Sequence, residues 1–306
     1  MRLVGLYLRM RSKRHFATID GAHRMLARAK TASEPPDGLR DRHSSSCVDY
    51  EGFRCWTVEP RHSTPTRTVL YLHGGAYVNE IFPGHWALID RIVEGGGRVV
   101  VPLYGLAPEH GYTAAYRLLT RVYRDILSTV RPADIAIAGD SAGGGLALGF
   151  AQTLLSTGLP QPDRLLLISP WLDLTLQNPD IERLARKDPW LAAPGARECG
   201  RVWAEGADPR IPQLSPLGGP LAGIAPLDIY IGTRDILLPD VLLLCDRAAA
   251  EGAVIDLTVC PGAVHVYPLT PTREGRLASA GIVSALSGRG SGVPERRIDV
   301  CARIAR

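Results

Sequence analysis

Residues 137–146 read IAGDSAGGGL and place six small residues around Ser141, at the end of the β-like run 134–138. A chain that turns sharply from a strand into a helix needs small neighbours, because larger side chains would collide and the turn favours residues that tolerate positive φ. Such a turn exposes the serine hydroxyl. The pattern Gly139-x-Ser141-x-Gly143 is weak alone, because a serine that only caps a helix gives a similar sequence. Its meaning depends on whether the chain supplies partners for a nucleophile.

The length and composition of the chain predict a folded protein with a large core. The chain has 306 residues, of which 45% are hydrophobic and 22% charged, which excludes disorder throughout. The net charge is +4, but residues 1–30 carry eight basic side chains against one acid, and residues 289–306 carry five against two. These basic residues are not part of a recognisable binding module, so we expect no nucleic-acid partner.

The cysteines and the N-terminus bear on the compartment. The six cysteines are widely spaced, with no CxxC pair or His/Cys cluster, so we expect no metal site and a reducing, cytoplasmic environment. The start, MRLVGLYLRMRSKR, has an apolar run too short for a secretory signal or a membrane span. We therefore expect no stable membrane insertion. Peripheral contact of this basic N-terminus with an anionic membrane is the alternative to a helix packed on its own domain.

Strand-like and helix-like segments alternate along the chain, which predicts an α/β fold with a mostly parallel sheet and helices on both faces. Several strands are nearly continuous apolar runs, as expected for strands buried on both faces. The expected strands are 68–72, 98–102, 134–138, 164–168, 227–231 and 254–259. The expected helices are 85–94, 114–129, 142–156, 240–251 and 272–286.

Two helix-prone segments interrupt this alternation, residues 1–45 and about 176–215. We expect them to form a small helical cap over the C-terminal edge of the sheet, where open α/β sheets place their sites. The α/β domain would then span residues 46–288, with the cap insertion inside it. The Gly-rich, charged tail at 289–306 is expected to be disordered.

Backbone donors are expected near Ser141. Gly74 and Gly75 directly follow the strand 68–72. Two glycines at a strand end let N–H groups approach a ligand closely, which is how an oxyanion hole is built from main chain. Ala142, which follows the serine, would supply another N–H. We therefore predict an oxyanion hole of Gly74, Gly75 and Ala142.

Candidates for a general base and its acid also follow expected strands. Asp235 comes after the strand 227–231, and His265 comes after the strand 254–259. The order Ser141, Asp235, His265 is that of a nucleophile-elbow hydrolase. Asp240 is a competing acid, but it follows Pro239 at the start of a helix, where capping and the helix dipole explain an aspartate. The sequence therefore favours Asp235 as the acid.

With these motifs in place, the chain resembles the hormone-sensitive-lipase-like family of α/β-hydrolases, which includes bacterial carboxylesterases. The resemblance covers about residues 65–285 and implies the α/β-hydrolase fold with a helical cap, no metal, no organic cofactor, and hydrolysis of short- or medium-chain acyl esters. The family commonly has Arg where this chain has Gly105, and Asn where it has Gly145. The resemblance rests on HGGAY at 73–77, LAPEH at 106–110, GDSAGG at 139–144, SPWLDL at 169–174, and the loops that hold Asp235 and His265.

Other conspicuous residues have structural interpretations. The resemblance makes His73 a residue that shapes the glycine loop rather than a second catalytic histidine. Asp140 either orients the elbow or caps the helix that follows. Trp171, Trp190 and Trp203 either line an acyl pocket or belong to the core, which is the usual place of large aromatic side chains.

These expectations define a serine carboxylic-ester hydrolase of lipid metabolism that cleaves a small-molecule ester through a Ser-His-Asp triad and an acyl-enzyme. An acyltransferase, a lactone hydrolase or an N-deacetylase would use the same triad. The joint presence of serine, aspartate and histidine argues against a noncatalytic ligand-binding protein. The sequence leaves a homodimer open.

Overall fold

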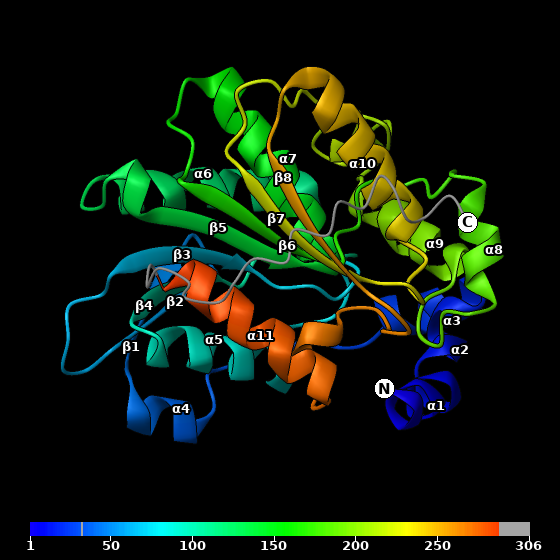
Figure 1. Ribbon diagram of the computed structural model, residues 1–306, viewed down its shortest axis with the longest axis horizontal. Helices are drawn as coiled ribbons and strands as arrows, with labels where there is room; N and C mark the ends of the chain where they lie inside the picture. The colour runs from blue at the N-terminus through cyan, green and yellow to red at the C-terminus, as the bar shows by residue number, and fades with distance from the viewer. Residues whose placement is uncertain (32, 288–306) are drawn as a thin grey trace.

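A single eight-stranded sheet forms the centre of the molecule in the computed structural model, which describes residues 1–31 and 33–287 (Figure 1). The strand order is β1-β2-β4-β3-β5-β6-β7-β8. The pairs β1–β2 and β2–β4 are antiparallel, and the other pairs are parallel. The predicted α/β fold is confirmed, while the predicted disordered tail lies outside the described residues. The strands are β1 Ser44–Tyr50, β2 Phe53–Glu59, β3 Arg67–Leu72, β4 Gly97–Pro102, β5 Ile135–Asp140, β6 Arg164–Ile168, β7 Leu227–Gly232 and β8 Ile255–Cys260.

Helices cover both faces of this sheet (Figure 1). One apolar cluster joins the sheet to α5 and α11, and a second joins it to α6, α7 and α10. The central strands are continuous apolar runs because side chains on both of their faces are buried, and every residue of β5 is buried. The covering helices are α5 Pro83–Glu94, α6 Tyr112–Leu127, α7 Ser141–Thr157, α10 Leu238–Glu251 and α11 Arg273–Leu286. Short 3-10 helices span Pro132–Asp134, Pro216–Gly218 and Tyr267–Leu269.

The hairpin of β1 and β2 is absent from the strands expected from sequence. Most of β1 is exposed, and its sequence, SSSCVDY, has no continuous apolar run. A tight turn joins the two strands, with positive φ at Glu51 and Gly52 and a hydrogen bond from the Gly52 N–H to Asp49 Oδ1 at 2.8 Å. Strand β1 is therefore held at the sheet edge mainly by backbone pairing to β2, whereas β2 pairs with β4 and also buries Cys55, Trp56 and Val58.

The two segments predicted to form a cap meet at one end of the sheet (Figure 1). Helices α1 (Arg2–Arg11), α2 (Lys13–Phe16) and α3 (Ile19–Leu26) lie near α8 (Asp180–Ala185) and α9 (Ala193–Trp203). Their contact is close, because a Cβ on Gly195 would lie 2.6 Å from Phe16 Cα. Helix α4 (Asp37–Arg42) lies apart from them, beside β1.

Among the described residues, no helix is both long and apolar enough to cross a bilayer.

Candidate active site

Ser141 lies at the junction of β5 and α7 with a φ of 51°, a left-handed conformation that non-glycine residues rarely adopt. Its small neighbours let three backbone segments pass each other. A Cβ on Gly139 would lie 2.3 Å from Gly143 O, and a Cβ on Gly143 would lie 2.0 Å from Leu72 O. The crowding of small residues around the serine is therefore a steric requirement of this turn.

The structure brings Ser141, His265 and Asp235 together at the C-terminal ends of β5, β8 and β7. Ser141 Oγ lies 2.9 Å from His265 Nε2, and His265 Nδ1 lies 2.8 Å from Asp235 Oδ2. All three side chains are buried. Because a carboxylate only accepts, Nδ1 carries the imidazole proton, and Nε2 of the neutral ring is free to accept the serine proton.

The electrostatic surroundings of His265 favour its protonated form. Burial by itself would lower the pKa of His265, but the negative charge of Asp235 and its hydrogen bond outweigh burial and raise the pKa above its ordinary value. Asp188 and Asp140 add to this effect. An imidazolium formed during a reaction at Ser141 would therefore be stabilised where it stands.

Asp240 does not reach His265. Its Oδ1 accepts a hydrogen bond from Asn178 Nδ2 at 3.0 Å, and its Oδ2 is buried without a partner among the described residues. Burial raises the pKa of Asp240 to about 6. The predicted capping role is wrong, because α10 has no side-chain cap and Asp240 lies inside its first turn.

The glycine loop after β3 differs in detail from the prediction. The N–H of Gly74 donates to Asp140 Oδ1 at 3.0 Å, so it is not available to a ligand. Within the described chain, the N–H groups of Gly75, Ala76 and Ala142 have no such acceptor. Positive φ at Gly75 and Ala76 turns the loop at this point. The structure therefore does not support Gly74 as an oxyanion donor.

Asp140 orients the elbow and does not cap α7. Besides Gly74, its buried carboxylate accepts a hydrogen bond from Tyr71 Oη at 2.8 Å and contacts His85 Nε2 at 3.0 Å. His85 Nδ1 accepts the Phe82 N–H, so its Nε2 carries the proton that points at Asp140. Burial would raise the pKa of Asp140, but His85 and the other hydrogen bonds hold it below its ordinary value. Sequence reasoning missed His85.

Asp188 is a second buried acid beside the pair of Asp235 and His265, and sequence reasoning missed it as well. Its Oδ2 accepts the Ile236 N–H at 3.0 Å, and its Oδ1 accepts the N–H groups of Trp190 and Leu191. Burial and the nearby charge of Asp235 raise the pKa of Asp188. The segment between β6 and β7 is thereby attached to the loop that carries Asp235.

An apolar cavity of about 470 Å³ is lined by Val266, the residue after His265, although no residue of the predicted triad or oxyanion hole lines it. Trp190 lines it and packs its ring edge-to-face against the His265 ring, with centroids 5.5 Å apart. Trp171 and Trp203 are buried and stack on Tyr77, so they belong to the core. The cavity is also lined by Leu3, Val4, Tyr7, Leu8, Phe82, Val266, Leu269, Thr270 and Pro271.

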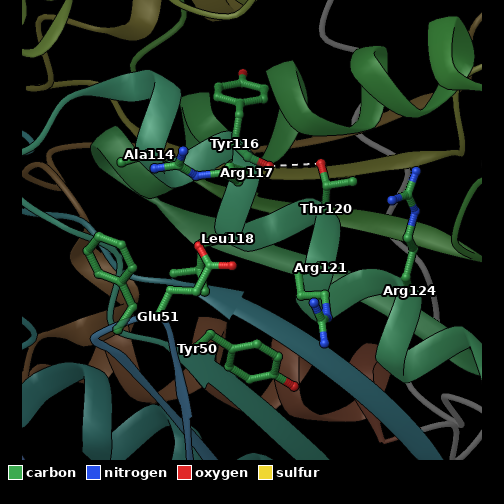
Figure 2. A pocket seen from close by; sticks show the side chains of 10 residues that line it. Tyr50, Glu51, Ala114, Tyr116, Arg117, Leu118, Thr120, Arg121 and Arg124 are labelled. Carbon is green, nitrogen blue, oxygen red and sulfur yellow. Dashed lines mark hydrogen bonds between the residues drawn. The ribbon is translucent and has the colours of Figure 1, made fainter.

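A larger cavity of about 510 Å³ lies between the β1–β2 turn and α6, and it contains no residue of the predicted site. Arg117, Arg121 and Arg124 line it, but their side chains point in different directions (Figure 2). They do not converge on a common point, so we do not assign a ligand to it. In the described part of the chain, no group of His, Cys, Asp and Glu is arranged to hold a metal ion.

Comparison with known proteins identifies the class to which this fold and this site belong. A family model described as alpha/beta hydrolase fold matches residues 69–269, and the chain belongs to this family. An acetyl-hydrolase of Streptomyces hygroscopicus is 34% identical over 69% of this chain and 72% of its own length. Esterase LipU of Mycobacterium tuberculosis is 32% identical over 82% of this chain and 85% of its own.

A solved esterase of the bacterial hormone-sensitive lipase family is 28% identical, with a TM-score of 0.75 over 88% of this chain and 97% of its own. The resemblance to hormone-sensitive-lipase-like hydrolases is confirmed. This chain is a hydrolase of the carboxylesterase class.

Proposed function

We propose that the chain is a serine hydrolase that cleaves short- and medium-chain acyl esters with Ser141 as nucleophile, His265 as general base and Asp235 as the acid that orients it. The observation that carries this proposal is the continuous hydrogen-bond chain from Ser141 Oγ through His265 to Asp235. Each group is within the reach that such a proton transfer requires.

In the first half of the reaction, Ser141 Oγ attacks the ester carbonyl carbon while its proton passes to His265 Nε2. The carbonyl π electrons move to oxygen and give a tetrahedral oxyanion. When this intermediate collapses, the bond to the leaving alcohol breaks and His265 returns its proton to the alcohol oxygen. The product is the acyl-enzyme on Ser141, and the imidazole is neutral again.

In the second half, water takes the place of the alcohol. His265 removes a proton from the water, whose oxygen attacks the acyl carbon. Collapse of the second tetrahedral intermediate breaks the bond to Ser141 Oγ, which takes the proton from His265. The carboxylic acid leaves, and Ser141 is restored.

The oxyanion donors in this proposal are the N–H groups of Gly75, Ala76 and Ala142. Their lack of an acceptor within the described chain supports them. Gly74 has a different task, since its bond to Asp140 ties the glycine loop to the elbow. Loss of one oxyanion donor typically costs on the order of 3 kcal/mol in transition-state binding, so the placement of this loop matters for the rate in addition to that of the triad.

The cavity beside Trp190 supports small esters as substrates. Its volume of about 470 Å³ lies toward the lower end of the range for small-molecule sites, and one relative is named an acetyl-hydrolase. The cap in this proposal consists of α1–α3 with α8 and α9. The N-terminal helix contributes Leu3, Val4, Tyr7 and Leu8 to the cavity wall, and it should influence acyl preference.

A panel of p-nitrophenyl esters of increasing acyl length tests this proposal. We expect kcat/KM to be highest for short acyl chains and to fall for long ones, with no strong activation by emulsified triglyceride. Lactones, N-acetyl compounds and ester assays with added alcohol distinguish the lactone hydrolase, N-deacetylase and acyltransferase alternatives. Fastest turnover of the longest chains would contradict a small capped pocket.

We also propose a cytoplasmic location, which the absence of a disulfide among the described cysteines supports.

A further inference from the structure

Helix α1 carries a row of large apolar side chains that face solvent. Leu3, Leu6, Tyr7 and Met10 are 84%, 58%, 61% and 72% exposed. Their spacing of i, i+3, i+4 and i+7 places them on one side of the helix. The opposite side is the packed one, because Leu8 is buried.

This exposed row is unusual for the surface of the molecule. Other exposed large apolar residues of the described chain, such as Val48 in β1 and Val254 in the loop before β8, are separate in sequence. Scattered apolar side chains need no explanation, whereas a contiguous row marks a surface that is covered by something else. Leu3 and Tyr7 of this row also line the apolar cavity beside Trp190, so the row continues into the cavity mouth.

Exposed arginines lie near the row. Arg9 and Arg14 are exposed on α1 and α2, and Arg9 donates to the carbonyl of Arg186, whose own side chain is exposed. Residues 1–30 hold eight basic side chains, and Asp20 is their only acid. The charge of Arg9 and Arg14 disfavours pairing of the face with the same face of a second copy, because like charges would be brought together.

We propose that the exposed face of α1 binds peripherally to an anionic lipid surface. An exposed apolar row with arginine beside it is the arrangement in which a helix lies in the plane of a membrane interface. The apolar side chains enter the boundary of the acyl chains, and the basic groups stay at the level of the anionic headgroups. The mouth of the cavity then opens beside the membrane.

Vesicle sedimentation tests the proposal with the full chain. We expect the protein to sediment with vesicles of phosphatidylcholine and phosphatidylglycerol but not with phosphatidylcholine alone. Raising the salt from about 0.1 M to about 1 M should release it, because the Debye length falls from about 10 Å to about 3 Å. The double variant Leu6→Ser/Met10→Ser should bind at least about tenfold more weakly, since it removes two of the inserted side chains.

Val48→Ser/Val254→Ser is the matched control, because these residues are exposed to a similar extent but lie in β1 and in the loop before β8. It should bind like the wild type. Leu6 and Met10 do not line the cavity, so hydrolysis of p-nitrophenyl acetate without vesicles should be unchanged in both double variants. Unchanged activity and an unchanged Tm would show that both variants fold. The vesicle-binding result then does not depend on whether the proposed catalytic mechanism is correct.

Three results would overturn the proposal. One is failure of the wild type to bind anionic vesicles. Another is binding that is equal on phosphatidylcholine alone. The third is a wild-type dimer in solution that Leu6→Ser/Met10→Ser converts to a monomer, which would assign the face to a second copy of the chain.

Discussion

The carboxylate of Asp188 accepts the backbone N–H of Ile236, the residue that follows Asp235, at 3.0 Å. This bond connects the segment between β6 and β7 to the loop that faces His265. The other Asp188 oxygen accepts the N–H groups of Trp190 and Leu191. Asp188 thus fixes both the backbone beside the proposed catalytic acid and the tryptophan that packs on the proposed base.

Replacing Asp188 by Asn should affect both positioning and charge. Asn has only one accepting oxygen, so its NH₂ group must face a backbone N–H on one side. We therefore expect kcat to fall about tenfold and the free energy of unfolding to fall by about 1–3 kcal/mol. The charge of Asp188 helps raise the pKa of His265. Its removal should therefore shift the acidic limb of the kcat/KM profile to lower pH, because the neutral base persists to lower pH.

The matched control for this variant is Asp173→Asn. Asp173 also accepts backbone and hydroxyl hydrogen bonds, from Thr175 and Ser215, but it does not contact Ile236. We expect Asp173→Asn to lower Tm without moving the acidic limb. If the acidic limb of the kcat/KM profile is unchanged in folded Asp188→Asn, the role of Asp188 is structural only.

The choice between the two acids near β7 can be tested by parallel substitutions. Asp235→Asn should lower kcat about 10⁴-fold while the fold is kept, because the amide favours the wrong His265 tautomer and cannot stabilise the imidazolium. Asp240→Asn should keep most of the activity. Steady-state kinetics with thermal unfolding distinguishes the two, and full activity of folded Asp235→Asn would exclude it from the triad.

Asp240→Asn should also stabilise the protein in a pH-dependent way. The pKa of buried Asp240 is raised from 3.8 to about 6, so the native state binds this proton more tightly than the unfolded state. Wild-type stability is therefore lost as pH rises from about 4 to about 6, by on the order of 1–3 kcal/mol. The variant should have a higher Tm than wild type at pH 7, with the difference disappearing near pH 4.

Labelling with a serine-directed phosphonate tests the nucleophile. The hydrogen bond from Ser141 to His265 should make Ser141 the only strongly reactive serine. Mass spectrometry of peptides should locate the adduct on Ser141, and Ser141→Ala should not be labelled. Labelling of Ser141→Ala at the wild-type rate would point to a different nucleophile.

Gly145 tests the steric account of the elbow. A Cβ at this position would lie 2.0 Å from Trp171 O, so Gly145→Ala should displace the start of α7 and lower stability by about 1–3 kcal/mol, together with kcat. The control is Gly218→Ala, where a Cβ would meet nothing within 4 Å. Equal Tm values for the two variants would contradict this account.

The parts of the fold that depend on sequence periodicity could be predicted, and the parts that depend on tertiary contact could not. The central parallel strands are apolar runs, so their limits differ from expectation by at most two residues. The exposed strand β1 has no such pattern. For the site, the spacing of Ser141, Asp235 and His265 after their strands indicated that they would meet.

Asp188, His85 and the bond from Gly74 to Asp140 gave no such signal. Each acts through a partner far away in sequence. Aspartate, histidine and glycine are also common at positions that have no part in an active site. The position of Gly74 in a glycine pair predicted that its N–H would be free to bind a ligand. This prediction failed because the sequence does not reveal which N–H donates to the Asp140 carboxylate. Local patterns identify which residues end a strand, but not the direction in which a backbone group points.

The wall of the cavity beside Trp190 comes largely from α1 and from residues 266–271 after β8, whereas the elbow is held by backbone atoms in close contact. The part of the wall that α1 contributes is therefore far in sequence from the elbow, whereas the part at 266–271 directly follows the proposed base His265. A chimera that takes α1 from a relative would replace four residues of this wall and leave the glycines of the elbow unchanged. Substitutions in α1 can therefore reshape the cavity while the packing around Ser141 is kept.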